Sequence, residues 1–348
     1  MKIGLIIQGP LISGGLTGAT WGKGKTRAPR DHFVEFDCVE QLSLNLKEIR
    51  KYFPMTIIST WDHFDTKSLQ ELDSSLVILK NPEPANLGDL LRKPVEGMTD
   101  VAHNNRYKQF DSLNYALEYL SNKDGITHFI KIRTDQVFNW QLLRDEVHTS
   151  FQRFPRKLFL PYRHEGIPFL FPDFYFGGSI QELGDYIRFV GNRKFKFHEN
   201  IHRDMALKLL FLNEPSRHLA HYIDFFLSDD KCTEYICNEL DLLYKNRIVL
   251  GTRELFYSIS WRGEKLTNNN LNFRFSGEIC DSKCIQVNQN EVDLKNFLLY
   301  NQVVRASLLC VITNWIWRDL EMKLKGLRKR ISSIKQRLLR RRIEDQIH

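Results

Sequence analysis

The sequence predicts an α/β fold in which a mostly parallel, Rossmann-like sheet is flanked by helices. Short apolar runs rich in Ile alternate with longer segments of helical periodicity over the first 140 residues. Gly, Pro, Asn or Asp bounds each run, and these residues are typical of the turns at strand ends. Such alternation favours parallel strands with the connecting helices packed on the faces of the sheet.

Six apolar runs predict strands, because each is short, continuous and bounded by turn residues. The first four lie in the regular part of the chain and the last two in a less regular part, at residues 3–7, 55–60, 76–79, 127–132, 158–161 and 247–250. Ligands bind parallel sheets at the carboxyl ends of the strands. The residues that follow these runs are therefore candidates for a site.

Apolar residues at intervals of three and four predict helices between the strands. The spacing runs through residues 39–53 and again through residues 110–120, which places one apolar stripe on each helix. Residues 206–212 and 219–226 are also predicted to be helical, whereas residues 264–292, rich in Asn and Ser, predict an irregular surface segment.

The composition is that of a folded protein with a basic end. The 348 residues are 42% apolar and 26% charged, which excludes a disordered, collagen-like or disulfide-rich chain. Residues 318–348 hold 11 Lys or Arg against 4 Asp or Glu, and so carry +7 of the formal charge of +8. The basic character therefore belongs to this end of the chain and says nothing about the substrate of the rest.

Residues 19–26 nearly match a phosphate-binding P-loop, with Ala19 in place of the first Gly. That chemistry needs a loop that leaves a strand directly and opens a helix. The predicted strand ends near Gln8, and Pro29 disfavours a helical first turn. A Gly-rich loop is the favoured interpretation, and ATP hydrolysis stays an alternative.

Two patterns point weakly to zinc. His198, Glu199 and His202 form an HExxH sequence, in which two His share a helix face and Glu199 is a general base. Arg203 and Asp204 follow at once, where a buried zinc helix usually stays apolar. The Cys pairs 232/237 and 280/284 lack CxxC spacing, so reduced thiols are favoured over a zinc knuckle.

The third candidate lies at the end of the strand predicted over residues 127–132. Arg133 and Asp135 follow on the same side of an extended chain, where a carboxylate could hold a divalent cation that bridges two phosphates. Arg106 heads the apolar stripe of the preceding helix, where its guanidinium could reach a phosphate. A structural ion pair, either Arg133–Asp135 or Arg106 with an Asp, is the alternative.

Several short blocks, in order, resemble the WavE lipopolysaccharide-synthesis family of bacterial glycosyltransferases. The resemblance covers about residues 1–225. The blocks are Ile-Ile-Gln-Gly-Pro at 6–10, Phe-Pro at 53–54 with Ile-Ile-Ser-Thr-Trp at 57–61, Asn-Pro at 81–82, Asn-Asn-Arg at 104–106 with Gln109 and Ser112, Lys-Ile-Arg-Thr-Asp at 131–135, Asp-Phe-Tyr-Phe-Gly at 173–177, and Asn-Glu-Pro at 213–215.

The resemblance implies a fold similar to the GT-A glycosyltransferases and a nucleotide-sugar donor as co-substrate. The donor is expected to lie along the sheet edge, with the acceptor hydroxyl deprotonated by Asp173 or, as second choice, Glu214. Asp135 is the expected ligand of a divalent metal, Mn or Mg. The expected donor-binding residues are Gln8, Gly9, Pro10, Ser59, Thr60, Trp61, Arg106, Lys131 and Arg133.

The chain departs from the family pattern at the metal position. Arg133 fills the place of the first carboxylate of a DxD-like motif, which leaves Asp135 alone. Arg106, Lys131 and Arg133 are therefore an alternative to the metal for neutralising the leaving phosphates. The stretch between Pro10 and Asp37 is also longer and richer in Gly and Lys than the family leads one to expect.

The predicted organisation has four parts. A nucleotide-sugar-binding half and an acceptor-side half form one catalytic domain, followed by an irregular apolar connection and a basic amphipathic helix, at residues 1–145, 146–265, 266–317 and 318–348.

The basic helix predicts attachment to a membrane surface. Apolar residues recur every three or four positions from Leu320 to Leu338 among Lys and Arg, and Trp315 and Trp317 precede them. Such a helix favours an anionic lipid surface over self-association, with docking on the protein or a partner as alternatives. With no secretory signal, the protein is expected in the cytoplasm, peripheral on the inner face of the cell membrane.

The sequence thus predicts a glycosyltransferase that moves a sugar from a nucleotide-sugar to a lipid-linked saccharide in lipopolysaccharide or capsule synthesis, without nucleic acid as partner. A non-catalytic membrane adaptor of polysaccharide assembly is the main alternative. A zinc hydrolase using His198, Glu199 and His202 is the other.

Overall fold

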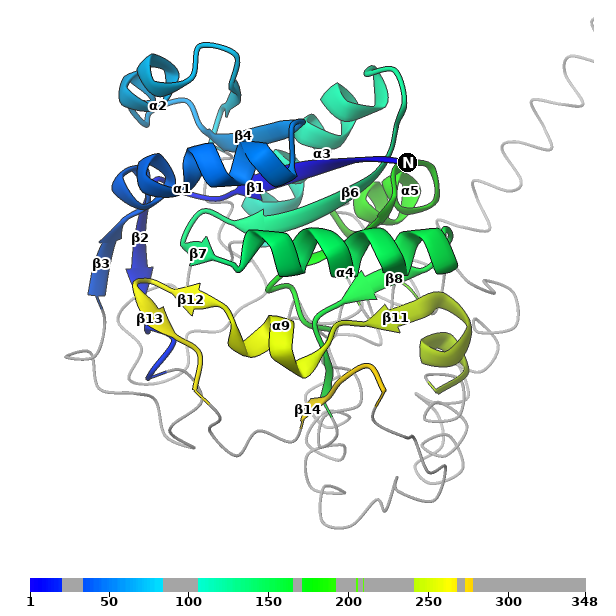
Figure 1. The fold of residues 1–348 in the computed structure, drawn as a ribbon. Helices are drawn as coiled ribbons and strands as arrows, with labels where there is room; N and C mark the ends of the chain where they lie inside the picture. Colours follow the sequence, from blue (N-terminus) through cyan, green and yellow to red (C-terminus); the bar gives the residue numbers. More distant parts are fainter. Residues whose placement is uncertain are drawn as a thin grey trace, which may run out of the picture. The chain divides into compact units, whose positions relative to one another are not determined.

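A seven-stranded sheet with helices on both faces forms the centre of the computed structural model (Figure 1). Contacts divide the chain into Met1–Glu291 and Val292–His348, and every described residue belongs to the first unit. The structure describes residues 1–20, 34–83, 106–164, 171–191, 205, 209, 241–267 and 273–277.

The strands follow one another across the sheet in the order β11-β8-β10-β6-β1-β4-β5. β1, β4, β5 and β6 are parallel, β10 runs antiparallel to its neighbours β6 and β8, and β11 is parallel to β8. Their bounds are β1 Lys2–Gln8, β4 Thr56–Trp61, β5 Val77–Asn81, β6 Ile126–Arg133, β8 Leu158–Leu160, β10 Phe176–Ser179 and β11 Ile248–Leu250.

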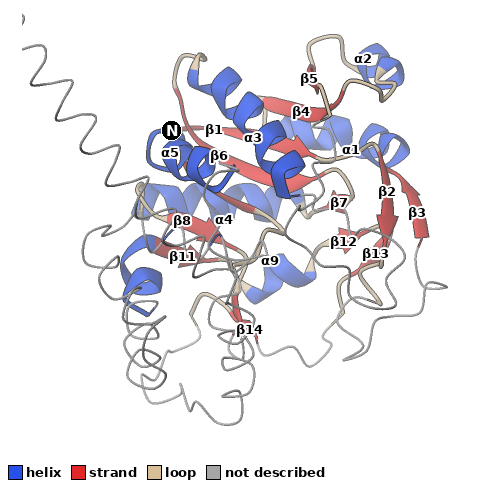
Figure 2. Cartoon of the chain, turned by 180° about the vertical axis from the view of Figure 1, so that it is seen from behind, coloured by secondary structure: helices blue, strands red, loops and turns tan. Residues whose placement is uncertain are grey.

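The central strands are mostly apolar because both of their faces are covered. Figures 1 and 2 show α1 and α4 on one face of the sheet and α3 and α5 on the other. The helices are α1 Cys38–Tyr52, α3 Arg106–Ser121, α4 Trp140–Arg153 and α5 Ile180–Gly191. The shorter α2 Lys67–Leu72 and α9 Arg253–Tyr257 lie outside these layers.

Side-chain alternation along β1 and β6 separates two apolar layers. Leu5 and Ile7 of β1 and Ile130 and Ile132 of β6 belong to the buried cluster that also contains the inner faces of α1 and α4. The alternate side chains of β6 face the other layer, where the stripe of α3 is buried through Phe110, Leu113, Leu117 and Leu120.

Three small antiparallel sheets accompany the central sheet in the described residues. β2 (Ile12–Gly15) pairs with β3 (Val34–Asp37), and β12 (Ser260–Trp261) pairs with β13 (Glu264–Lys265). β12 also pairs with β7 (Gln136–Val137), directly after the end of β6. β9 (Arg163–His164) pairs with β14 (Phe273–Arg274).

The predicted fold class is confirmed: the sheet is mostly parallel and helices flank it on both faces. The six predicted strands correspond to β1, β4, β5, β6, β8 and β11, and the two apolar stripes to α1 and α3. The sheet takes strands from both expected halves of the catalytic domain. Apart from residue 209, the predicted helices at 206–212 and 219–226 and the basic helix at 318–348 lie outside the described residues.

Candidate functional site

A cavity of about 270 Å³ opens at the carboxyl edge of β1, β4 and β6. From β1 the chain moves to β4 and β5 on one side and then returns past β1 to β6 on the other. Parallel sheets bind ligands at such a switch point, because the loops that leave the two central strands diverge there. The cavity volume is close to the lower end of the range for small-molecule sites.

The end of β1 supplies backbone to the cavity floor. Gly9 donates its N–H to the carbonyl of Ser59 at 3.2 Å, and the carbonyl of Gln8 accepts from Thr134 N–H at 3.2 Å. The side chain of Gln8 donates to the carbonyl of Gln109 in the first turn of α3 at 2.6 Å. These bonds hold the ends of β1, β4 and β6 and the start of α3 around one point.

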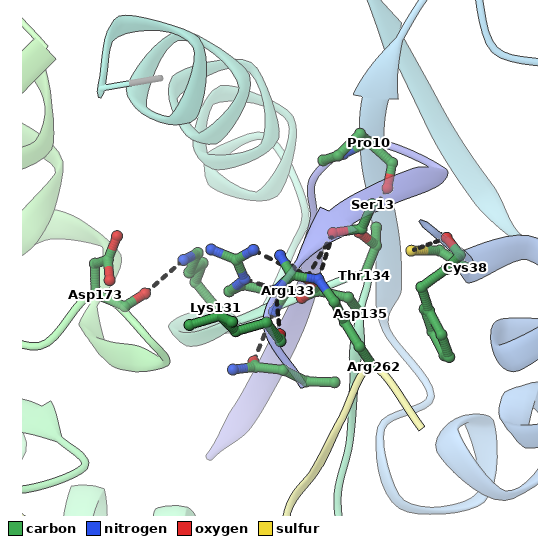
Figure 3. A network of polar contacts seen from close by, with 12 residues as sticks. Pro10, Ser13, Cys38, Lys131, Arg133, Thr134, Asp135, Asp173 and Arg262 are labelled. Carbon is green, nitrogen blue, oxygen red and sulfur yellow. Dashed lines mark hydrogen bonds and ion pairs between the residues drawn. The ribbon is translucent and has the colours of Figure 1, made fainter. Parts of the chain in front are cut away.

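Asp135 lies beneath the floor, in an ion pair with two arginines (Figure 3). Arg133 donates from Nε to Oδ1 at 2.9 Å and from Nη2 to Oδ2 at 3.0 Å, and Arg262 Nη2 lies 3.0 Å from Oδ2. The hydroxyl of Ser13 donates to the same Oδ2 at 2.7 Å. The Asp135 side chain is only 1% exposed, whereas that of Arg133 is 30% exposed.

The charges around Asp135 keep it ionised. Burial alone would raise the pKa of its carboxyl group, but Arg133 and Arg262 hold that pKa well below its usual range. Asp135 in turn raises the pKa of Arg133 against the opposing effect of burial. Cys38 lies behind this pair as a free thiol, and burial raises its pKa to about 12, so the thiol is unreactive.

Lys131 projects from β6 into the cavity wall and is 1% exposed. Its ammonium group donates to the backbone carbonyl of Asp173 at 2.8 Å (Figure 3). With the Gln109 amide oriented to satisfy both groups, its oxygen accepts from Lys131 Nζ at 3.0 Å and its nitrogen donates to Asp173 Oδ2 at 3.2 Å. Burial lowers the pKa of Lys131 to about 8, although the charge of Asp173 opposes this.

The opposite wall combines aromatic side chains with a second ion pair. Trp61 at the end of β4 and the nearby Phe64 line the cavity. Lys108 in the first turn of α3 pairs with Glu83, and His63 Nδ1 lies 3.5 Å from the same carboxylate. The cavity therefore has an aromatic side near β4 and a cationic side near β6.

The cavity gathers most of the expected donor-binding residues. Those that line it are Gln8, Gly9, Pro10, Trp61, Lys131 and Arg133. Ser59 and Thr60 are instead buried in the sheet, where Ser59 bonds the hydroxyl of Ser112 at 2.8 Å and accepts from the Asn81 amide at 2.9 Å. These two residues support the end of β4 rather than the cavity surface.

Two expected residues fall outside what the structure describes. The backbone of Arg106 begins α3, two residues before Lys108, but its side chain is not among the described ones. Glu214, the HExxH residues 198–202, the four paired cysteines and residues 21–26 of the P-loop-like segment also lie outside the described residues.

Sequence reasoning missed Arg262 and Ser13 altogether. Arg262 sits at a left-handed backbone position with φ of 49°, in the turn between β12 and β13. It contacts residues more than 120 positions earlier in the chain, and no local sequence motif predicts such a contact. Lys108 and Gln109 also line the cavity, and their position two and three residues after the expected Arg106 is a signal that could have predicted them.

The described surroundings of Asp135 do not fit a divalent cation. Both carboxylate oxygens are bonded to guanidinium groups, and no three His, Cys, Asp or Glu side chains among the described residues are placed to hold a metal ion. A metal would have to displace at least one fixed cation from Asp135. The metal expected at Asp135 stays a prediction without support from these residues.

Comparison with known proteins leaves the family open. No protein-family model and no curated protein match the sequence. Among solved structures, a cytidylyltransferase from Leptospira borgpetersenii serovar Hardjo-bovis is 11% identical, with a TM-score of 0.32 over 62% of this chain and 73% of that chain. CMP:2-keto-3-deoxy-manno-octonic acid synthetase complexed with CTP is 7% identical, with a TM-score of 0.35 over 61% of this chain and 87% of that chain. Likenesses this distant carry no argument about activity, and the resemblance to the WavE family stays a prediction.

None of the described helices combines the length with the apolar character that crossing a bilayer would need.

Proposed function

We propose that the protein is a glycosyltransferase that uses a nucleotide-sugar donor. The observation that carries this proposal is the cavity at the switch point between β1 and β6, where Lys131, Arg133 and Arg262 line one side. Buried and half-buried cations beside a sheet edge favour an anionic ligand, and a diphosphate is the anion that this reaction class releases. The resemblance in the sequence supports the same class.

The two sides of the cavity suggest how the donor lies. The diphosphate belongs near the cations at the end of β6, and the base belongs near Trp61 and Phe64, because aromatic rings stack on nucleobases. Gly9 permits close approach of the donor to the backbone of β1. In this orientation the sugar lies on the side of Lys131 where its ammonium group bonds the backbone carbonyl of Asp173. Asp173 itself adjoins the cavity through Lys131 and Gln109 and does not line it.

In the proposed reaction the bond between the sugar anomeric carbon and the diphosphate oxygen breaks, and the electron pair leaves with the nucleoside diphosphate. An acceptor hydroxyl oxygen forms the new bond to that carbon, and its proton passes to the carboxylate of Asp173. Lys131 and Arg133 stabilise the negative charge that develops on the leaving group. Gln109 positions Asp173 through its amide.

The acceptor we propose is a lipid-linked saccharide of lipopolysaccharide or capsule synthesis. The support is the sequence alone: the resemblance, and the basic amphipathic segment at 318–348, which fits an anionic membrane surface. The protein would then work at the cytoplasmic face of the membrane, where its soluble donor and its lipid-linked acceptor meet.

Thermal unfolding with added nucleotides tests the donor half of the proposal. At least one of UDP, GDP, ADP and CMP is expected to stabilise the full chain, and Arg133→Gln is expected to remove that shift. Arg144→Gln is the matched control, because Arg144 also pairs with an adjacent carboxylate but does not line the cavity. The absence of stabilisation by all four nucleotides, with and without Mn²⁺, would contradict the proposal.

Release of nucleoside diphosphate from a nucleotide-sugar, with transfer to a lipid-linked saccharide, tests the reaction itself. Release of pyrophosphate from a nucleoside triphosphate and a sugar phosphate would instead identify a nucleotidyltransferase. If Arg133→Gln leaves the surface saccharide of the cell unchanged while loss of residues 318–348 alters it, the protein acts as a membrane adaptor.

A further inference from the structure

We propose that Arg133 and Arg262, both held by the single carboxylate of Asp135, form a two-arginine site that binds the donor diphosphate without a divalent metal ion. The identity of the anion rests on the function proposed above. Arg262 thereby becomes a binding residue, although it lies 127 positions after Asp135. Asp135 then does not bind a metal ion; it positions the two guanidinium groups.

The charges at Asp135 do not balance, and the excess is positive. One carboxylate serves two guanidinium groups, with Arg133 on both oxygens and Arg262 on Oδ2. This leaves one net positive charge beside the cavity that both arginines line. A divalent cation at this point would be repelled, whereas an anion would be attracted, and partial burial strengthens both effects.

The two arginines retain hydrogen-bond donors for a ligand. A guanidinium carries five N–H groups. Among the described residues, Arg133 uses only Nε and Nη2 for hydrogen bonds, and both of them bind Asp135. Arg262 uses three N–H groups, toward Ser13 Oγ at 3.1 Å, the carbonyl of Leu16 at 2.6 Å and Asp135 at 3.0 Å. Both side chains therefore keep N–H groups for an anion in the cavity.

The site is fixed before any ligand arrives. The ring of Trp261 lies 5.8 Å from the Arg133 guanidinium carbon and 4.6 Å from that of Arg262. The backbone N–H of Arg262 also donates to the carbonyl of Asp135 at 2.9 Å. Gly15 lets the guanidinium lie against β2, since a Cβ there would be 2.7 Å from Nη1. Donors held in this way lose little conformational entropy on binding.

Lys131 completes the cationic side of the cavity. It projects from the same face of β6 as Arg133, two positions earlier, and lines the same space. One guanidinium group can bind two phosphate oxygens at once, and a lysine adds a point charge. Together the three side chains match a diphosphate, which carries more charge and more acceptor oxygens than orthophosphate.

Isothermal titration of the full chain with inorganic pyrophosphate in EDTA tests the site. We expect pyrophosphate to bind in EDTA at least as tightly as in Mg²⁺, which competes with the arginines for its oxygens, and orthophosphate to bind at least about tenfold more weakly than pyrophosphate. Arg262→Gln and Arg133→Gln are each expected to weaken pyrophosphate binding by about tenfold or more, as the loss of charged hydrogen bonds implies. Arg144→Gln is the control, because it removes the same charge from a residue that does not line the cavity.

Folding of each variant is checked by circular dichroism. Arg262 also holds Ser13 and Leu16, so if Arg262→Gln does not fold, the test rests on Arg133→Gln, because the Arg133 side chain is 30% exposed. Pyrophosphate binding that needs Mg²⁺ or Mn²⁺, or that survives both substitutions, overturns the proposal. So does Mn²⁺ binding by the wild-type chain that Asp135→Asn abolishes.

The outcomes separate this site from the proposed function. Sugar transfer that requires Mn²⁺ and tolerates Arg262→Gln leaves the glycosyltransferase in place and removes the two-arginine site. Metal-free pyrophosphate binding that depends on both arginines, in a protein that consumes no nucleotide-sugar, leaves the site in place and removes the glycosyltransferase.

Discussion

Gly9 is the residue at which β1 leaves the sheet, and its backbone has a φ of +145°, a value that other residues rarely adopt. A Cβ at this position would lie 2.7 Å from Thr134 Oγ1, which itself donates to the carbonyl of Pro10. We expect Gly9→Ala to lower the free energy of unfolding by about 1–3 kcal/mol, because both the conformation and the contact are strained. Urea unfolding measures this loss.

Gly14 in β2 is the matched control for that substitution. A Cβ there would meet no atom within 4 Å, and Gly14 does not have a positive φ. Gly14→Ala should change the free energy of unfolding by less than about 0.5 kcal/mol. Equal effects at Gly9 and Gly14 would show that the end of β1 is not tightly constrained.

Lys131 gives the site a pH dependence because burial lowers its pKa to about 8. The ammonium form, which binds phosphate, predominates below pH 8 and is lost above it. The affinity for a stabilising nucleoside diphosphate should therefore fall about tenfold between pH 7 and pH 9. Titration calorimetry at several pH values measures the fall.

Lys131→Met is the corresponding control, because methionine does not titrate. The variant should bind weakly at pH 7 and show no further loss up to pH 9. A wild-type affinity that is constant across this range would mean that Lys131 does not contact the nucleotide.

Residue patterns predicted one side of the site and missed the other. Gln8 and Arg133, the last residues of β1 and β6, line the cavity together with Gly9, because parallel strands bring their carboxyl ends to one edge. The Arg133–Asp135 ion pair was foreseen as an alternative to a metal site. Arg262 was not foreseen, since its contact depends on how β12 folds back on β7 and not on any local pattern.

At the scale of elements, continuous apolar runs predicted the strands of the sheet that are buried on both faces, and regular stripes predicted α1 and α3. Helices α4 and α5 were not predicted, although α4 buries a comparable stripe of Trp140, Leu143, Val147 and Phe151. The reversed strand β10 was missed because it has only four residues, of which two are glycines that weaken any strand signal. β2 and β3 were missed for a related reason: both are short, and they pair across a stretch that the sequence does not mark as a hairpin.

Helix α4, which follows β7 in the chain, begins at a side-chain cap. Asn139 Oδ1 accepts from the N–H of Leu142 at 3.0 Å, which satisfies one of the free donors of the first turn. We expect Asn139→Ala to cost about 1 kcal/mol in urea unfolding and Asn139→Asp to cost less, because aspartate caps a helix equally well. Equal losses in both variants would contradict a capping role.

At the scale of the whole molecule, the basic segment at 318–348 is expected to bind anionic lipid. Each basic residue near an anionic surface contributes on the order of 1 kcal/mol, and salt screens the effect. The full chain should sediment with vesicles that contain phosphatidylserine and not with pure phosphatidylcholine. The double charge reversal Arg341→Glu and Arg342→Glu should weaken that binding strongly.

A double reversal on the body of the protein controls for net charge. Lys67 and Arg156 are 79% and 81% exposed and lie outside the cavity. Lys67→Glu with Arg156→Glu changes the net charge by the same amount and should leave vesicle binding nearly unchanged. If both double variants lose binding equally, total charge and not the basic segment controls the association.

The order of the sheet, the cavity at its switch point and the cations around that cavity support one claim. A nucleoside diphosphate binds in the cavity at the carboxyl ends of β1 and β6. A crystal structure of the full chain with the nucleotide that stabilises it most tests this claim directly. The account predicts diphosphate oxygens within hydrogen-bond distance of the guanidinium groups of Arg133 and Arg262, above an intact Asp135 ion pair. A diphosphate bound elsewhere, or held at Asp135 through a metal ion, would contradict it.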